Sequence, residues 1–280
     1  MTVSITKADG TVEIFDTGKL TASLKHAGAS GEAALDITNE IAREIKDGAT
    51  THEIYRRAFA LLRGHRRTAA ARYSLKKAVL EFGPSGFPFE AYLAELFRTE
   101  GYDASVDRHI RGRCVEHEVD VVLARGSERV YVEAKFHNTP GFKTDLQVAL
   151  YVQARLEDIE AQVRAEHSSS QSTPLSLRGM LVTNTKFTSL ATQYAECQKL
   201  ELMGWDYPSG RSLNELIDVK KLYPITALTT LSRGEKTALL SQRVVLCRDL
   251  ARHEAALTHA GVHGNRMSEV LMEAGGLCDM

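Results

Sequence analysis

Hydrophobic and polar residues alternate along the first 15 residues, and an Asp9-Gly10 dipeptide interrupts the alternation. An Asp-Gly pair between two alternating runs favours a tight turn, so this segment predicts a β-hairpin. From there to about residue 82, apolar residues recur every three or four positions, with Ser or Thr before several of these runs and Gly after some of them. This periodicity and these caps predict helices. The front of the chain is therefore expected to form a small domain of one hairpin and several helices.

A break follows at residues 83–88, where two glycines and two prolines stand close together. Gly and Pro interrupt regular structure, so this segment is the clearest domain boundary in the chain. Beyond it, the pattern predicts helices over residues 89–100, 143–166 and 189–200, and strands over residues 119–123, 130–136, 177–183 and 202–207. Elements in this order are typical of an α/β sandwich built around a mixed sheet.

From residue 213 to the end of the chain the pattern is helical and gives no further strand signal. The sequence thus predicts an α/β (α+β) protein with three parts. These are a hairpin-plus-helices domain at residues 1–83, an α/β sandwich at residues 84–207 and a helical region at residues 208–280.

Composition limits how such a protein could attract nucleic acid. Hydrophobic residues make up 43% of the chain and charged residues 25%, which is ordinary for a globular protein, and the formal net charge is −1. No global positive field is present, so affinity for DNA must come from local basic clusters. Two such clusters occur in the sequence, one formed by Arg63, Arg66 and Arg67 and the other by Arg108, Arg111 and Arg113. Each is equally compatible with a solvated surface that binds no nucleic acid.

The cysteines lie far apart in the sequence and none forms a Cys-x-x-Cys pair. This argues against a structural zinc site and against a disulfide framework, and it fits a reducing compartment. The sequence begins without the apolar run of a signal peptide, and no stretch approaches the roughly 18 apolar residues of a membrane span. We therefore expect a cytoplasmic protein without a membrane partner.

Two acidic residues and one lysine stand out on the predicted strands, at Asp120, Glu133 and Lys135. Side chains on a strand alternate between faces, so Glu133 and Lys135 share one face. The short turn between the two strands makes them neighbours, which lets Asp120 lie beside this pair. Burial of an unpartnered carboxylate is unfavourable, and one divalent cation satisfies both carboxylates at once. The pattern therefore predicts a Mg²⁺ site, or a Mn²⁺ site.

Such a cation can polarise a phosphodiester and lower the pKa of an attacking water. Lys135 would orient that water, help to deprotonate it or stabilise charge on the phosphate. The main-chain carbonyl of Ala134 could supply a further oxygen ligand. Glu118 lies on the same predicted face as Asp120 and is either a second ligand or only a charge; Asp120 is favoured because apolar residues flank it. The alternative interpretation is a solvent-facing Glu–Lys pair on an amphipathic strand.

The order helix, Asp, Glu-x-Lys, helix resembles the PD-(D/E)xK nuclease superfamily, and most closely its branch with Mrr-type restriction enzymes. The resemblance covers about residues 87–207 and implies a restriction-endonuclease-like fold with catalytic roles for Asp120, Glu133 and Lys135. It also implies that Glu90, on the helix before the strands, reaches the metal site.

A further match lies on the helix after the Glu-x-Lys strand. Many members of the superfamily carry a glutamine there, followed four residues later by tyrosine, and Gln147 and Tyr151 match this pair. Residues four apart share one face of a helix, so both side chains can point at the site or at DNA. The resemblance therefore adds Gln147 to the candidate catalytic residues.

The front domain, residues 3–82, resembles the ATP-cone, a nucleotide-binding regulatory domain. By this resemblance Lys7 and Lys19 contact phosphates, while Glu13 and Thr51 help to hold ATP or dATP. Positive groups near a helix start suit an anion physically. The segments that match include residues 5–10, 47–51 and 71–75.

One position departs from the ATP-cone pattern, because Ala8 stands where members commonly carry Arg. Loss of an arginine that pairs with phosphate weakens binding. The alternative is a degenerate domain that mediates only self-association. No Gly-rich phosphate loop occurs in the chain, so the nucleotide is expected to act as an effector without being hydrolysed.

These observations predict a Mg²⁺-dependent DNA endonuclease that ATP or dATP regulates, in restriction (defence against foreign DNA) or DNA repair. The expected partners are DNA, an adenine nucleotide and further copies of the chain in a homo-oligomer. The alternative is a nucleotide-responsive DNA-binding regulator that has the nuclease fold and does not cleave.

Overall fold

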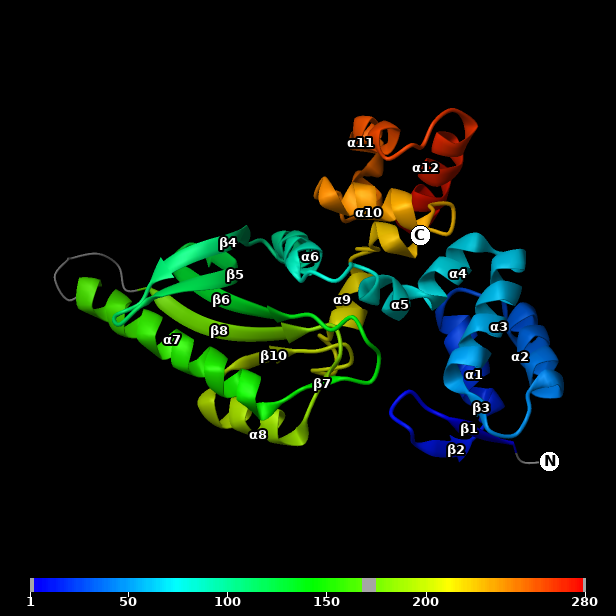
Figure 1. Cartoon of the computed structure of the whole chain (residues 1–280), viewed down its shortest axis with the longest axis horizontal. Coiled ribbons are helices and arrows are strands. Elements are labelled where there is room, and N and C mark those ends of the chain that lie inside the picture. Colours follow the sequence, from blue (N-terminus) through cyan, green and yellow to red (C-terminus); the bar gives the residue numbers. More distant parts are fainter. Residues whose placement is uncertain (1–2, 168–174, 279–280) are drawn as a thin grey trace. The chain divides into compact units, whose positions relative to one another are not determined.

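The structure is a computed structural model that describes residues 3–167 and 175–278 (Figure 1). The chain divides into two compact units: Met1–Glu81 together with Tyr223–Met280 form the first, and Phe82–Leu222 form the second. The sequence pattern treats residues 208–280 as one region, whereas this division falls at residue 222. None of the described helices is both long and apolar enough to cross a membrane.

The first unit begins with the hairpin that the Asp-Gly turn predicts. Strands β1 (Ser4–Thr6) and β2 (Val12–Ile14) pair antiparallel, and Gly10 has a φ of 82°, which a glycine adopts without strain. Strand β3 (Ala49–Thr50) then pairs parallel to β1 on its other side. The start of the helix after β3 is thereby brought beside the end of β1.

Five helices follow the hairpin in this unit. The side chain of Asp16 caps the first, and a reciprocal pair of bonds between Thr50 and Glu53 caps the third. Their buried faces supply the core, which includes Leu24, Ile37 and Leu62. The helices are α1 (Thr17–His26), α2 (Gly31–Glu44), α3 (Thr51–His65), α4 (Arg67–Tyr73) and α5 (Leu75–Leu80).

The C-terminal part of this unit packs on α4 and α5, since α12 contacts α4 and the short helix η1 contacts α5. Buried Glu273 links its loops: the carboxylate accepts hydrogen bonds from the main-chain N–H and the hydroxyl of both Thr229 and Thr230. Its elements are η1 (Ile225–Ala227), α10 (Arg233–Ser241), η2 (Cys247–Arg252), α11 (Glu254–His259) and α12 (Asn265–Cys278).

The second unit contains a five-stranded sheet in the order β10-β8-β6-β5-β4. The β6–β8 and β8–β10 pairs are parallel, whereas β4–β5 and β5–β6 are antiparallel. The sheet is therefore mixed, and the predicted α/β fold class is confirmed. The strands are β4 (Asp103–Arg111), β5 (Glu116–Arg125), β6 (Glu128–Lys135), β8 (Ser176–Thr183) and β10 (Glu201–Met203), with a separate small pair of β7 (Lys143–Thr144) and β9 (Lys186–Phe187).

Helices pack against this sheet (Figure 1). Helix α6 (Phe87–Thr99) packs on β4, β5 and β6, while α7 (Leu146–His167) packs on β8 and against α8 (Ser189–Gln198). A Cβ at Gly179 would lie 2.6 Å from a side-chain carbon of Leu156, so the absence of a side chain there lets α7 approach the sheet closely. Helix α9 (Leu213–Val219) completes the unit.

Candidate active site

Asp120 lies on β5 at the point where the pairing of this strand with β6 ends. The pairing of β5 with β6 runs from Arg125↔Glu128 to Val121↔Val132, and no pair is formed beyond it toward the start of β5. At that point the side chain of Asp120 takes the place of a strand partner, because its Oδ2 accepts a hydrogen bond of 2.7 Å from the N–H of Ala134. This bond holds Asp120 against the end of β6.

A second feature lies at the same position of the β4–β5 pair. β4 and β5 pair on both sides of Asp107, at Val106↔Val121 and Arg108↔Val119, but Asp107 itself has a φ of 53°. This left-handed conformation is strained for a residue with a side chain, although Asp tolerates it better than most. Asp107 stands across from Asp120 in the β4–β5 register, so backbone strain is concentrated beside the candidate site.

Glu133 lies on β6 next to this position, and its charge has a partner that the sequence analysis did not identify. Arg155 of α7 forms an ion pair with the Glu133 carboxylate, and their side chains are only 13% and 18% exposed. The same guanidinium bonds the hydroxyl of Tyr151, and its central carbon lies 4.6 Å from the centre of the Tyr151 ring. Arg155 thus fixes the orientation of Glu133.

More carboxylates than positive side chains gather beside the end of β6. Burial and the charge of Asp120 raise the pKa of Glu90 to about 7, with smaller contributions from Asp107 and Glu118. Burial also raises the pKa of Asp120, and burial together with the charge of Asp120 raises the pKa of Glu133. The structure therefore brings Glu90, Asp120 and Glu133 into one electrostatic cluster.

The other predicted residues lie around this cluster. Lys135 is exposed at the end of β6, and its charge opposes the rise in pKa of Asp120 and Glu133. Ala134 is half-buried and uses its N–H to bond Asp120. Gln147 is exposed on the first turn of α7 and, among the described residues, forms no hydrogen bond with the carboxylates of the cluster.

The donor chemistry fits a hard divalent cation, because carboxylate oxygens are the ligands that Mg²⁺ and Mn²⁺ prefer and the excess negative charge would be compensated. The side chains do not surround a common point at metal-ligand distances. Within residues 3–167 and 175–278, no three His, Cys, Asp or Glu side chains converge closely enough to hold a metal ion. A bound cation would therefore require Glu133 to share its oxygens between Arg155 and the ion.

The predicted nucleotide-binding residues also come together, in the first unit. Lys7 Nζ lies 2.6 Å and Lys19 Nζ 4.0 Å from the same oxygen of Glu13. Thr51 begins α3, directly after the pairing of Thr6 with the last residue of β3. The side chains are more exposed than those of the carboxylate cluster, at 41% for Lys7 and 70% for Lys19.

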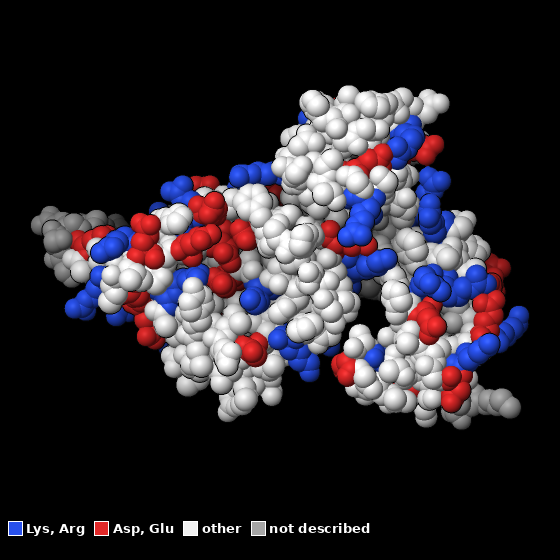
Figure 2. Space-filling model, in the orientation of Figure 1, with Lys and Arg blue, Asp and Glu red and all other residues white. Residues whose placement is uncertain are grey.

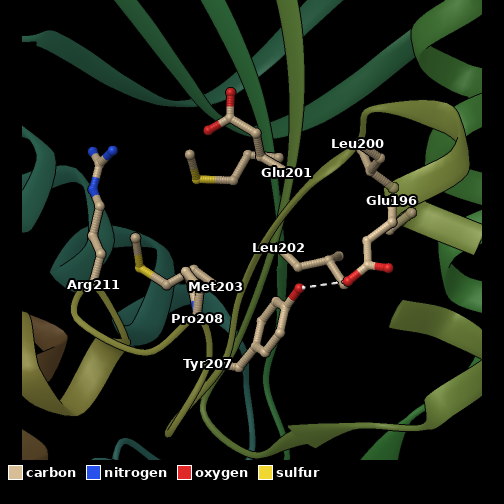
Figure 3. Close-up of a pocket in the computed structure, with 10 residues that line it drawn as sticks. Glu196, Leu200, Glu201, Leu202, Met203, Tyr207, Pro208 and Arg211 are labelled. Carbon is tan, nitrogen blue, oxygen red and sulfur yellow. Dashed lines mark hydrogen bonds between the residues drawn. The ribbon is translucent and has the colours of Figure 1, made fainter. Parts of the chain in front are cut away.

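A separate hollow of about 270 Å³ lies beside the edge strand β10 (Figure 3). Met180, Leu202 and Met203 contribute apolar surface to it. Its charged side chains already have partners. Glu196 accepts a bond of 3.4 Å from the Tyr207 hydroxyl, Arg211 lies 3.4 Å from Glu100, and Glu201 pairs with Arg178. The hollow lies at the opposite edge of the sheet from β4 and is not part of the candidate site.

The sequence is similar to that of an uncharacterized protein from Archaeoglobus fulgidus, with 35% identity over 183 residues, which covers 65% of this chain and 97% of that protein. A solved structure, described as AF1548, a protein of unknown function, has 32% identity and a TM-score of 0.56, and it covers 70% of this chain and all of that chain. The family AF1548-like, C-terminal, matches residues 223–278. This chain belongs to the AF1548-like family.

The restriction endonuclease family matches residues 84–208 of this AF1548-like protein. The expected restriction-endonuclease-like domain is thereby confirmed, and it contains the whole carboxylate cluster. A structure of the MspJI restriction endonuclease with a 27-mer oligonucleotide is a much weaker match, with 15% identity and a TM-score of 0.31 over 87% of this chain and 48% of that chain. That similarity is too low to carry an argument.

Two residues of the site were missed by the sequence analysis. Arg155 follows Tyr151 by four residues and Gln147 by eight, so all three lie on one stripe of α7, and this spacing was a signal that could have been used. Asp107 gave no such signal, because a left-handed residue inside a strand has no sequence pattern of its own.

Proposed function

We propose that this protein is a divalent-metal-dependent DNA endonuclease in which Asp120 and Glu133 bind the cation. The observation that supports the proposal is a pair of half-buried carboxylates, Asp120 and Glu133, whose pKa values are raised. They lie where the β5–β6 pairing ends, and Asp120 is held there by the N–H of Ala134. Perturbed titratable groups that gather at one point often mark a catalytic site. The restriction-endonuclease-like domain supports phosphodiester hydrolysis as the reaction.

A bound Mg²⁺ or Mn²⁺ would polarise the phosphate and make water more acidic. Arg155 holds Glu133 in one orientation through its ion pair. Lys135, exposed beside both carboxylates, can donate to a phosphate oxygen or orient the attacking water. Glu90, with a pKa of about 7, can exchange a proton near neutral pH.

The test is a cleavage assay on plasmid and branched DNA with Mg²⁺ or Mn²⁺. Wild type is expected to cleave, and Glu133→Gln is expected to leave DNA intact. Glu157→Gln is the matched control, since Glu157 is exposed on α7 and, among the described residues, accepts a hydrogen bond from Gln153 alone. Cleavage by Glu133→Gln at the wild-type rate would remove the assignment.

A second candidate function is a DNA-binding regulator that does not cleave. The observation in its favour is that Arg155 neutralises Glu133, which leaves Asp120 as the only one of the two without an ionic partner among the described residues. In the same assay, DNA that migrates more slowly but stays uncut with either metal would support this candidate.

We further propose that the first unit binds ATP or dATP as an effector through Lys7, Glu13, Lys19 and Thr51. Lys7 and Lys19 both lie beside the Glu13 carboxylate, so two ammonium groups are available together for a phosphate. Thr51 stands at the N-terminus of the 15-residue helix α3, where main-chain N–H groups favour anions. Stabilisation on melting in the presence of nucleotide tests this, because a ligand of the folded state raises the melting temperature.

The proposed setting is restriction or DNA repair in the cytoplasm, by a homo-oligomer. Cleavage compared between modified and unmodified plasmids, and between linear and branched DNA, separates the two roles. Light scattering with and without ATP measures the oligomeric state.

A further inference from the structure

The hairpin formed by β4 and β5 continues past the point where the pairing of β5 with β6 ends. Its two strands stay paired as far as Arg111↔Glu116, whereas pairing with β6 ends at Val121. Among the residues that the structure describes, the hydrogen bonds of residues 107–119 lie within this hairpin or reach α7, so the segment forms an arm. The arm begins at Asp107 and ends at the residue before Asp120, so its base is the candidate active site.

One side chain of α7, that of Asp158, fastens the tip of this arm. Its carboxylate accepts hydrogen bonds from the N–H of Cys114 at 2.9 Å and of Val115 at 3.3 Å, and it lies 2.8 Å from Nε2 of His117. The N–H of Arg113 donates to the main-chain carbonyl of Asp158 at 3.0 Å. These bonds lower the pKa of Asp158, which is therefore ionised at neutral pH. The turn of an isolated hairpin would not be held in this way.

The contact between tip and helix is also close. A Cβ at Gly112 would lie 2.0 Å from an oxygen of Asp158 and 2.8 Å from the carbonyl oxygen of Val115, so no larger residue fits while the anchor is formed. Asp158 is three residues from Arg155, so it lies about one turn away on α7. Neighbouring turns of α7 thus hold both the tip of the arm and the orientation of Glu133.

Two of the side chains exposed at this tip are basic, and they lie beside exposed Cys114 and Val115. Arg111 and Arg113 are exposed, and neither forms an ion pair with any residue that the structure describes. Of the acidic residues of the arm, Glu116 stands opposite Arg111 in the strand register and lies 3.3 Å from His109, while Asp107 and Glu118 contribute to the cluster around Glu90. Across the face of the molecule in Figure 2, acidic and basic side chains are interspersed. A polyanion would therefore have to be attracted by local groups such as Arg111 and Arg113, because the molecule has no overall positive field.

We propose that this arm is a preformed DNA-backbone contact, in which Arg111 and Arg113 bind phosphates of duplex DNA beside the candidate active site and Asp158 is the residue that positions them. The inference rests on the proposed function for the identity of the polyanion. The anchoring of the tip by Asp158 favours phosphate binding, because an anchored segment loses little conformational freedom when phosphate binds. Arg is suited to phosphate through its fork of N–H donors.

The first experiment measures binding without cleavage. Anisotropy of a labelled 30-base-pair duplex is recorded in EDTA at several salt concentrations, for the full chain and for Arg111→Gln/Arg113→Gln. Both positions are exposed, so the fold is expected to stay intact. The variant is expected to bind about tenfold or more weakly, with the slope of log K against log salt reduced by about two. The control Arg56→Gln/Arg252→Gln removes the same charge from exposed positions of the other unit and is expected to leave both values unchanged.

Three outcomes would overturn the proposal: the same affinity and salt slope as wild type, no DNA binding by wild type in EDTA, or tighter binding to duplex RNA than to DNA. Failure of the nuclease proposal looks different, since wild type would then bind through the arm in EDTA and leave DNA uncut with Mg²⁺.

The second experiment tests Asp158 as a positioning residue. Asp158→Ala removes every side-chain bond to the tip, whereas Asp158→Asn keeps an acceptor. With Mg²⁺, Asp158→Ala is expected to raise the DNA concentration at half-maximal rate about tenfold and to leave the rate at saturating DNA within about twofold, because the phosphate contacts are lost while the carboxylates remain. Asp158→Asn should recover part of the loss. If Asp158→Ala lowered the cleavage rate by the same factor at low and at saturating DNA, Asp158 would have a structural role, and the positioning role would be contradicted. In EDTA, Asp158→Ala should weaken DNA binding in the same way whether or not the protein cleaves.

Discussion

Asp47 in the first unit and Glu90 in the second lie in opposite electrostatic environments. The Asp47 carboxylate accepts bonds of 2.8 and 2.6 Å from the N–H and hydroxyl of Ser4, and these bonds lower its pKa. Glu53 is held by Thr50 in the same manner, also with a lowered pKa. Around Glu90, burial and neighbouring carboxylates raise the pKa to about 7.

This difference separates charges that support the fold from charges that oppose it. An ionised Asp47 adds to stability because its partners favour the charged form, whereas an ionised Glu90 is penalised by burial and by repulsion. A fold keeps an unfavourable carboxylate cluster when something outside the chain compensates it, and a divalent cation is the simplest candidate.

The largest effect is expected from the carboxylates of the cluster. Asp120→Asn and Glu133→Gln are each expected to reduce DNA cleavage about 10³-fold or more, since each removes a charge from the reacting centre. Single-turnover assays with Mg²⁺ measure this, with circular dichroism to check the fold. Glu53→Gln, a change to a carboxylate of the first unit, is expected to leave the rate unchanged. Equal losses for Glu53→Gln and Glu133→Gln would remove the distinction between the units.

The ion pair between Arg155 and Glu133 is the next test. Arg155→Met leaves a mostly buried carboxylate without its ionic partner, and breaking such a pair costs on the order of 3–5 kcal/mol. Urea unfolding of Arg155→Met, Glu133→Gln and the double variant gives the coupling energy. The double variant is expected to be more stable than Arg155→Met alone. If the single and double changes were simply additive, the ion pair would not be coupled in the folded protein.

The pH dependence of melting should differ in sign between the two units. Glu90 has a folded-state pKa near 7 against a usual 4.5, so its contribution to stability is full below about pH 4.5 and is lost as pH rises through 7. Glu90→Gln is therefore expected to melt a few degrees above wild type at about pH 8 and with wild type below about pH 4.5.

Asp47→Asn provides the opposite case. The lowered pKa of Asp47 stabilises the fold above its usual value of 3.8, and this contribution is lost as pH falls through the lowered value. Asp47→Asn is expected to melt below wild type near neutral pH and to approach it in acid. Calorimetry that resolved the same sign of pH dependence for both variants would contradict the contrast.

The smallest effect is expected from nucleotide binding. A ligand at about 100 times its Kd adds about 2.7 kcal/mol, so saturating ATP or dATP should raise the melting temperature by a few degrees. Lys7→Ala/Lys19→Ala should abolish this rise, whereas Lys25→Ala, which lies later on α1, should retain it. An unchanged melting temperature of wild type at millimolar nucleotide would remove the effector proposal.

Local sequence patterns predicted much of the fold and the placement of the carboxylates. The alternation on β5 and β6, where Val119, Val121 and Val132 are buried, was sufficient to place Asp120 beside the end of β6. The turn at Gly10 was predicted for the same reason, since hairpin geometry depends on neighbouring residues only.

Other features depend on contacts between distant segments and were not predictable in this way. Strand β4 is polar, with only Ala104 buried along its length, because it lies at the edge of the sheet and has no apolar alternation. The pairing of Arg155 with Glu133 depends on how α7 docks on the sheet. The anchoring of the arm by Asp158 joins residues more than 40 positions apart and gives no local signal.

The most direct test of the central claim is calorimetric titration of the protein with Mn²⁺ in the absence of DNA. Wild type is expected to bind the ion, and Asp120→Asn/Glu133→Gln is expected to lose that binding while it keeps its fold. Undiminished Mn²⁺ binding by the double variant would contradict the assignment of these two carboxylates as the metal site.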